Sequence, residues 1–132
     1  MSRSATILSG FNNHFEEFID SIQSVFPNDV DILASKNALK QIRKANPKLI
    51  IKIWKEFIVD KYDNEINKGD IRFFIDKDYN QDISGLDSSN KIMDGIDRLR
   101  KPIRDMGEKN QAVSMSYIAN LSKISKIYYP IN

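Results

Sequence analysis

Oxygen-bearing side chains between residues 76 and 87 follow the spacing of a calcium-binding loop. In an EF-hand, carboxylate and carbonyl oxygens of a twelve-residue loop coordinate Ca²⁺ between two helices. The chain offers as oxygen ligands Asp76, Asp78, Asn80, Asp82, Ser84 and Asp87. However, Gln81 replaces the glycine that makes the sharp turn, and Asp87 replaces the longer glutamate that normally binds through both oxygens. We therefore predict an Asx-rich capping loop without a metal, and calcium binding is the alternative.

A long run of cations is the other feature that could do chemistry. Residues 32–55 contain seven bases and no acid, whereas residues 1–31 carry a net charge of −4 and residues 56–87 carry −5. The seven bases are Lys36, Lys40, Arg43, Lys44, Lys48, Lys52 and Lys55. A second basic cluster surrounds Pro102 and consists of Arg98, Arg100, Lys101 and Arg104. Gathered cations bind phosphates by releasing counterions, or dock acidic proteins by charge complementarity.

Most catalytic and metal chemistries lack their residues in this sequence. Cysteine does not occur and His14 is the single histidine, which excludes thiolate sites, histidine triads and multi-histidine metal sites. The sequence has no glycine-rich phosphate loop, no nucleophile elbow and no metalloprotease helix motif. We interpret His14 as a packing residue and carboxylate pairs such as Glu16 with Asp20 as solvated acids. We predict a protein without enzymatic activity and without a cofactor.

The hydrophobic periodicity predicts helices along the whole chain. The expected helices span residues 7–26, 29–45, 47–68, 71–75, 88–107 and 108–129. Pro27 ends the first helix, Asn46 and Pro47 make a tight corner before the third, and Pro102 kinks or ends the fifth. The β-branched run after Pro47 has a strand as its alternative, which its length and its lack of alternation disfavour.

The apolar positions assign an inward face to each helix. In the second helix the inward residues are expected to be Val30, Ala34, Ala38, Ile42 and Ala45. In the last helix the apolar seam comprises Val113, Tyr117, Leu121, Ile124 and Tyr128. The third helix is apolar around about 200° of its circumference, so we expect it at the centre of the bundle with Trp54 in the core. Tyr117, Tyr128 and Tyr129 could leave part of the last seam exposed for self-association.

Helical spacing gathers the seven bases of residues 32–55 into two stripes. One stripe lies opposite the alanines of the second helix, and the other combines Lys48, Lys52 and Lys55 in a narrow sector of the third. A tight corner at Pro47 would unite both stripes on one surface. Three interpretations remain open, namely binding to nucleic-acid phosphates, binding to an acidic protein, and a solvated face without a partner.

Length and composition limit the number of domains and the class of fold. The 132 residues, of which 41% are hydrophobic and 29% charged, predict one all-α domain over 1–132. We expect a compact bundle of five or six helices with an acidic loop near 76–87, and flexible ends at 1–6 and 130–132. No apolar run approaches the roughly 20 residues of a membrane span. The absence of cysteine and of a secretory signal predicts an intracellular protein.

Four segments carry a resemblance to a known group of proteins. They are FNNHFEEF at 11–18, VFPNDVDI at 25–32, IRKANPKLIIKIW at 42–54 and IDRLRKPI at 96–103. With these segments the chain resembles short uncharacterised proteins of the large nucleocytoplasmic DNA viruses of algae and amoebae. The resemblance implies a viral product in the host cytoplasm, at the viral factory, or in the virion. We expect a structural or assembly protein that binds other proteins or itself, and the alternative is a nucleic-acid-associated factor that acts in the virion nucleoid or in late transcription or replication.

Overall fold

The computed structural model describes residues 2–76 and 87–130, with side chains for residues 2–76 and 91–130. Within these ranges the chain is a compact all-α bundle of six helices without a strand, which confirms the predicted fold class. The helices are α1 (Arg3–Val25), α2 (Val30–Ala45), a continuous unit of α3 (Leu49–Trp54), η1 (Lys55–Val59) and α4 (Asp60–Asn67), then α5 (Arg72–Ile75), α6 (Asp87–Asp105) and α7 (Glu108–Tyr128).

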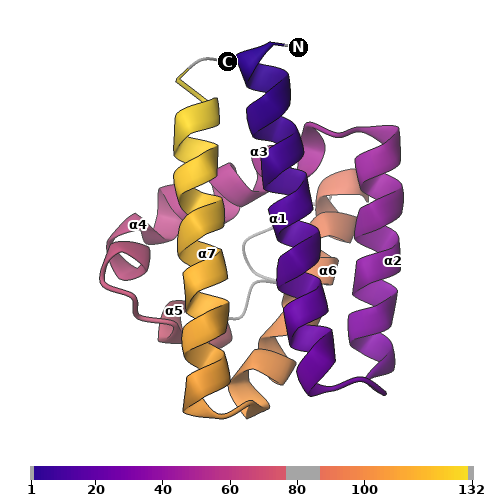
Figure 1. The fold of residues 1–132 in the computed structure, drawn as a ribbon, viewed down its shortest axis with the longest axis vertical. Coiled ribbons are helices and arrows are strands. Elements are labelled where there is room, and N and C mark those ends of the chain that lie inside the picture. Colours follow the sequence, from indigo (N-terminus) through magenta and orange to yellow (C-terminus); the bar gives the residue numbers. More distant parts are fainter. Residues whose placement is uncertain (1, 77–86, 131–132) are drawn as a thin grey trace.

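Antiparallel neighbours organise the bundle. In Figure 1, α1 lies between α7 and α2, and the start of α1 lies beside the end of α7. The unit of α3, η1 and α4 crosses behind α1 and α7, while α6 packs against α2 and passes behind α1. The front helices α1, α2 and α7 therefore each have one side toward α3 and α6 in the layer behind them.

Short polar residues set the helix boundaries, largely as the sequence predicts. α1 begins four residues earlier than expected, because the Ser2 hydroxyl accepts a hydrogen bond from the Ala5 amide at 3.1 Å. The Asp29 carboxylate caps α2 by accepting from the amides of Asp31 and Ile32 at 2.8 and 3.2 Å. α3 follows Pro47 within two residues, which confirms the tight corner. The strand alternative for this segment is wrong.

The third helical unit is irregular in its middle and sharply ended. Its η1 segment is a π-helical turn, and Tyr62 in α4 leaves helical geometry with φ −128° and ψ 25°. Gly69 ends the unit at φ 70°, where its amide donates to the Ile66 carbonyl and the Asp70 amide donates to the Glu65 carbonyl, both at 3.0 Å. This pair of bonds is a Schellman motif, which confirms the predicted glycine terminator.

Proline does not end α6. Pro102 lies inside the helix, which continues to Asp105, and the Met106 amide donates to the Pro102 carbonyl at 3.0 Å. The sequence predicts a kink or an end of the helix at Pro102, with a continuation beyond it as the alternative. The structure shows the continuation. Close packing against α2 accompanies it, because a Cβ at Gly95 would lie 3.5 Å from Leu39 and the Ser35 hydroxyl donates to the Gly95 carbonyl at 3.2 Å.

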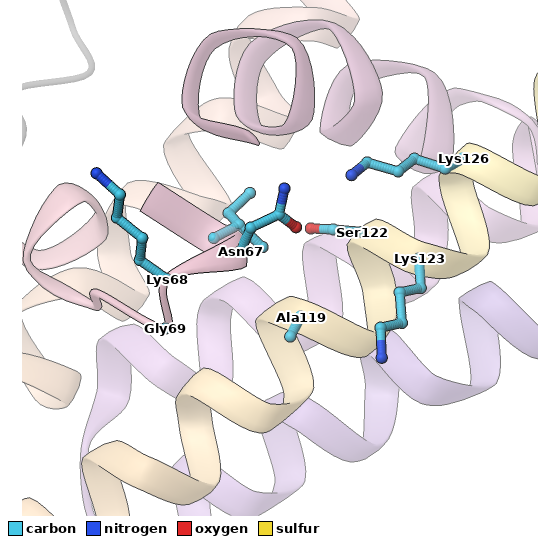
Figure 2. A pocket seen from close by; sticks show the side chains of 8 residues that line it. Asn67, Lys68, Gly69, Ala119, Ser122, Lys123 and Lys126 are labelled. Carbon is cyan, nitrogen blue, oxygen red and sulfur yellow. The ribbon is translucent and has the colours of Figure 1, made fainter. Parts of the chain in front are cut away.

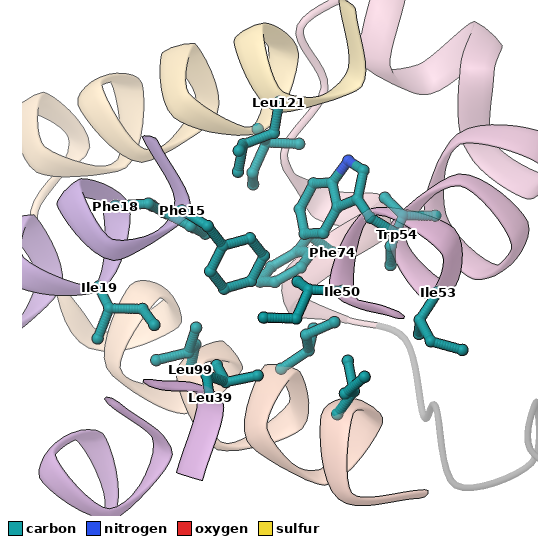
Figure 3. Close-up of a cluster of buried hydrophobic side chains, with 14 of the residues drawn as sticks. Phe15, Phe18, Ile19, Leu39, Ile50, Ile53, Trp54, Phe74, Leu99 and Leu121 are labelled. Carbon is teal, nitrogen blue, oxygen red and sulfur yellow. The ribbon is translucent and has the colours of Figure 1, made fainter. Parts of the chain in front are cut away.

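Aromatic side chains occupy the centre of the core. Trp54, Phe15, Phe18 and Phe74 are almost completely buried, as the position of Trp54 in the third helix predicts. The Trp54 ring meets Phe15 edge to face with centroids 5.6 Å apart, and Figure 3 shows the two rings together with Phe74 and Leu121. None of the described helices is both long and apolar enough to cross a membrane.

The predicted inward face of α2 is wrong in phase, whereas that of α7 is mostly confirmed. In α2 the buried residues are Ile32, Ser35 and Leu39, and the expected inward residues that are instead exposed are Val30, Ala34, Ala38 and Ala45. In α7 the buried residues are Ser114, Met115, Ile118, Leu121, Ser122, Ser125 and Tyr128. Of the predicted α7 seam, Leu121 and Tyr128 are buried and Tyr117 and Ile124 pack against the core, while Val113 is 43% exposed. The error in α2 involves a buried serine, because the small hydroxyl of Ser35, with its hydrogen bond to α6, occupies a position that a hydropathy pattern assigns to the surface.

Candidate functional site

The calcium-loop alternative falls mostly outside the described residues. Asp78, Asn80, Asp82 and Ser84 lie there, and Asp87 is described only in its backbone. Asp76 is exposed at the end of α5. Within residues 2–76 and 91–130, no three potential metal-ligating side chains come together. The calcium alternative therefore stays a prediction.

Acids of α1 neutralise the basic stripe of α2. The Lys36 ammonium lies 2.6 Å from an Asp20 oxygen, and the Lys40 ammonium lies 4.0 Å from Glu16. Arg43 donates to the same Glu16 carboxylate and, at 2.9 Å, to the Asn13 side-chain oxygen. Three of the four predicted α2 cations are thus ion-paired with the neighbouring helix.

The cations at the corner between α2 and α3 remain without such acids. Lys44, Lys48 and Lys52 are exposed, and no described carboxylate lies within ion-pair distance of them. Lys48 and Lys52 are four residues apart around the start of α3, a spacing that puts Cβ atoms about 5–6 Å apart. Lys55, the last of the seven, pairs with Asp60 at 2.5 Å. We call the three exposed lysines the basic corner.

A buried side chain of α1 holds the backbone of the basic corner. Asn12 is only 2% exposed, and its side-chain amide donates to the Pro47 carbonyl at 3.0 Å. The Lys48 amide donates to the Asn46 side-chain oxygen at 3.3 Å, which fixes the turn between α2 and α3. The sequence gives no hint of the Asn12 contact, because 35 residues separate the partners. These two contacts anchor the backbone of the turn that carries Lys48.

The second predicted cluster, around Pro102, mostly stabilises the fold. Arg100 is 5% exposed, pairs with Asp97 at 2.8 Å, stacks 4.5 Å from the Phe74 ring centroid and donates to the Phe74 carbonyl. Arg104 donates to the Ile75 carbonyl, with its Nε at 3.1 Å. These two arginines therefore satisfy the last carbonyls of α5, which sequence spacing does not reveal.

The two remaining cations of this cluster are on the surface of α6. Arg98 lies 3.0 Å from Asp94 and 3.4 Å from Asp31, and Lys101 lies 2.8 Å from Asp105. The Asp105 carboxylate raises the pKa of Lys101 above its ordinary value by hydrogen bonding. All four cations around Pro102 thus have partners within the molecule.

His14 packs at the edge of α1. Its Nδ1 lies 3.2 Å from a Glu17 oxygen, and its ring centroid is 4.8 Å from that of Tyr117 on α7. Tyr117 in turn stacks on Phe18 with centroids 5.6 Å apart. This placement is that of a residue joining α1 to α7.

A cleft of about 330 Å³ lies between the end of α4 and α7, and the sequence did not point to it. Its lining, shown in Figure 2, comprises Ile66, Asn67, Lys68, Gly69, Ala119, Ser122, Lys123 and Lys126. Lys126 pairs with Asp63. In Figure 2, the ammonium groups of Lys68 and Lys123 point away from the centre of the cleft. The carbonyl end of α4 is partially negative, so Lys68 at this end stabilises the helix, and the same partial charge disfavours an anion in the cleft. The basic corner is therefore the stronger candidate.

Comparison with known proteins adds no assignment to this geometry. No protein-family model, no curated protein and no solved structure matches the chain. The resemblance to proteins of large DNA viruses therefore stays a prediction. The function has to rest on the basic corner and its surroundings.

Proposed function

We propose that the protein is a non-catalytic binding protein that docks an acidic protein partner through its basic corner. The observation that carries this proposal is the contrast between Lys44, Lys48 and Lys52, which face no described carboxylate, and the cations beside them, which are neutralised from α1. An uncompensated positive patch attracts a complementary negative one and orients it. In the viral setting that the resemblance implies, this is a structural or assembly role.

The arrangement favours a protein over a nucleic acid as the ligand. Glu16 and Asp20 lie among the cations of α2 and would repel a phosphate backbone that followed the whole stripe. Three remaining lysines correspond to a logarithmic salt slope of only about −3, too small for tight sequence-independent binding at physiological salt. Trp54 is fully buried and offers no surface on which bases stack.

The three tyrosines of the last seam offer little exposed surface for self-association. Tyr128 is only 4% exposed, and Tyr117 and Tyr129 are partly buried against the core. Burial also raises the pKa of Tyr129 above its ordinary value. The partner that we propose is therefore a different protein rather than a second copy docked on this seam.

A charge-reversal pair of variants tests the proposal. K44E/K48E/K52E removes the basic corner, and K68E/K109E/K123E makes the same change at exposed lysines away from α2 that have no described ion pair. Both variants move the formal net charge from +2 to −4. Each would be used as bait for affinity purification from the cells that make the protein, with quantitative mass spectrometry and with or without nuclease.

We expect one set of captured proteins whose amount is unchanged by nuclease and unchanged with the control variant as bait. With the corner variant as bait, the captured amount should fall at least tenfold. Equal capture by both variants would show that the corner is not the docking site. Capture that disappears with nuclease in both the native protein and the control variant would assign the corner to nucleic acid instead. Circular dichroism of both variants checks that the helices are intact.

A further inference from the structure

The outward face of α2 is uncovered and mostly uncharged, with the exposed Lys40 and Lys44 beside Leu33 along one edge and the exposed Asp31 along the other. Val30 is 75% exposed and Leu33 is 46% exposed. The other exposed residues of this face are Ala34, Asn37, Ala38, Gln41 and Ala45. In Figure 1, α2 forms one side of the bundle, with α1 and α6 as its neighbours. We infer that an α-helix of the acidic partner docks on this face, an inference that rests on the proposed function.

Helix-on-helix packing suits the residues of this face. Ala34 and Ala38 are four residues apart, so they form a low ridge on which a second helix approaches closely, at about 8–10 Å between axes. Val30 and Leu33 supply the aliphatic contact at the start of α2. The 16 residues of α2 span about 24 Å, which is the length of a partner helix of about four turns.

Grooves on both sides of α2 add a charge requirement for the occupant. A groove of about 440 Å³ toward α1 is lined by Glu16, Lys40, Gln41, Arg43 and Lys44. A groove of about 180 Å³ toward α6 is lined by Ala34, Ser35, Ala38, Lys91, Asp94, Gly95 and Arg98. In the groove toward α1 the three cations exceed the single carboxylate, whereas toward α6 the two cations are matched by Asp94 and by Asp31, which pairs with Arg98. The matching helix therefore has acids along the edge of its apolar stripe that faces α1, with further acids where it meets the basic corner.

The same charges argue against a second copy as the occupant. A two-fold pairing of α2 with its copy is either parallel, which sets Lys44 near its own equivalent, or antiparallel, which sets Lys44 near the start of the other α2. The acids at that start already have partners, because Asp29 caps α2 and Asp31 pairs with Arg98. An acidic helix from another protein supplies carboxylates without such partners.

Neutral substitutions separate this inference from the proposed function. A34Q/A38Q adds bulk to the ridge without changing charge and keeps good helix formers, and A112Q is the matched change at an exposed alanine of α7. These variants would be compared with K44E/K48E/K52E in the nuclease-treated capture assay. In addition, a photo-cross-linking amino acid would be placed at Asn37 or Gln41, with Asn120 on α7 as the control position.

We expect A34Q/A38Q to lower capture at least tenfold and A112Q to leave it within twofold. Cross-links from Asn37 and Gln41 should fall within one acidic segment of about 16 residues that has helical periodicity, and those from Asn120 should not. Native capture by A34Q/A38Q with loss in the corner variant would overturn this inference and keep the proposed function. Native capture by both variants would overturn both, and cross-links only to a second copy or to nucleic acid would overturn the acidic-helix partner.

Discussion

The single tryptophan depends on one serine for its hydrogen bond. Trp54 is completely buried, and its indole N–H donates to the Ser122 hydroxyl at 3.1 Å. Ser122→Ala leaves that N–H buried without this acceptor, which costs about 1–3 kcal/mol. Alanine returns about 0.5 kcal/mol because it is the better helix former. We therefore expect a net loss of about 0.5–2.5 kcal/mol in the free energy of unfolding, or about 2–9 °C in Tm.

Ser116→Ala is the matched control on the same helix. The Ser116 hydroxyl donates to the carbonyl four residues back, as that of Ser122 does, at 3.2 and 2.8 Å respectively, but Ser116 is exposed. Its replacement should stabilise α7 by a few tenths of a kcal/mol. Urea unfolding followed by the fluorescence of Trp54 measures both variants, with the slope m as a check on two-state behaviour. Equal midpoints for the two variants would refute the role assigned to the buried hydrogen bond.

Three further predictions concern the backbone, a buried charge and an acid. Gly69→Ala should lower the free energy of unfolding by about 1–2 kcal/mol, because Gly69 has a positive φ. Gly10→Ala, at an exposed position of α1, should raise it by about 0.5–1 kcal/mol. Changes of the same sign for the two variants in urea unfolding would contradict this prediction. Arg100→Ala breaks a buried ion pair and should cost about 3–5 kcal/mol by the same assay, and a cost below 1 kcal/mol would contradict it. Hydrogen bonding from Arg72 lowers the pKa of Asp70 below its ordinary 3.8, so this pair stabilises the fold above that pH and the stabilisation is lost as pH falls through the lowered pKa. Carboxyl NMR titration of the Arg72→Gln variant should show the pKa of Asp70 rising, and an unchanged value would contradict the assignment.

Helix ends were predictable because they depend on neighbours in sequence. Pro27, the pair Asn46 and Pro47, and Gly69 act on φ, ψ or an N–H within a few residues, so their effect does not need the tertiary fold. Pro102 is the exception that the sequence left open. A proline inside a helix removes one backbone hydrogen bond, because it has no N–H. The helix continues past Pro102 because the packing of α6, in which Ile103 is fully buried, compensates for that lost bond.

Helix faces were less predictable because burial depends on which neighbour arrives. Ser35 is 1% exposed because its hydroxyl donates to the Gly95 carbonyl, 60 residues away, where α2 and α6 approach closely. A hydropathy pattern assigns serine to the surface and alanine to the core. For α2 it therefore predicts the wrong buried face and assigns Ala34 and Ala38, which are exposed, to the core. The exposed face of α2 therefore follows from the contacts of Ser35 and Leu39 with Gly95 of α6, which the sequence does not reveal.

Charge pairing between helices explains why three of the seven predicted cations form the candidate site. α1 and α2 run antiparallel, so the acidic second half of α1, with Glu16 and Asp20, lies against the basic stripe of α2. Asn12 marks the level at which α1 meets the corner, since it contacts Pro47. From Arg3 to Asn12 α1 contains no acid. The corner stays positive because the first half of its neighbouring helix has no carboxylate with which to neutralise it, and this uncompensated charge is the basis of the proposed docking of an acidic partner.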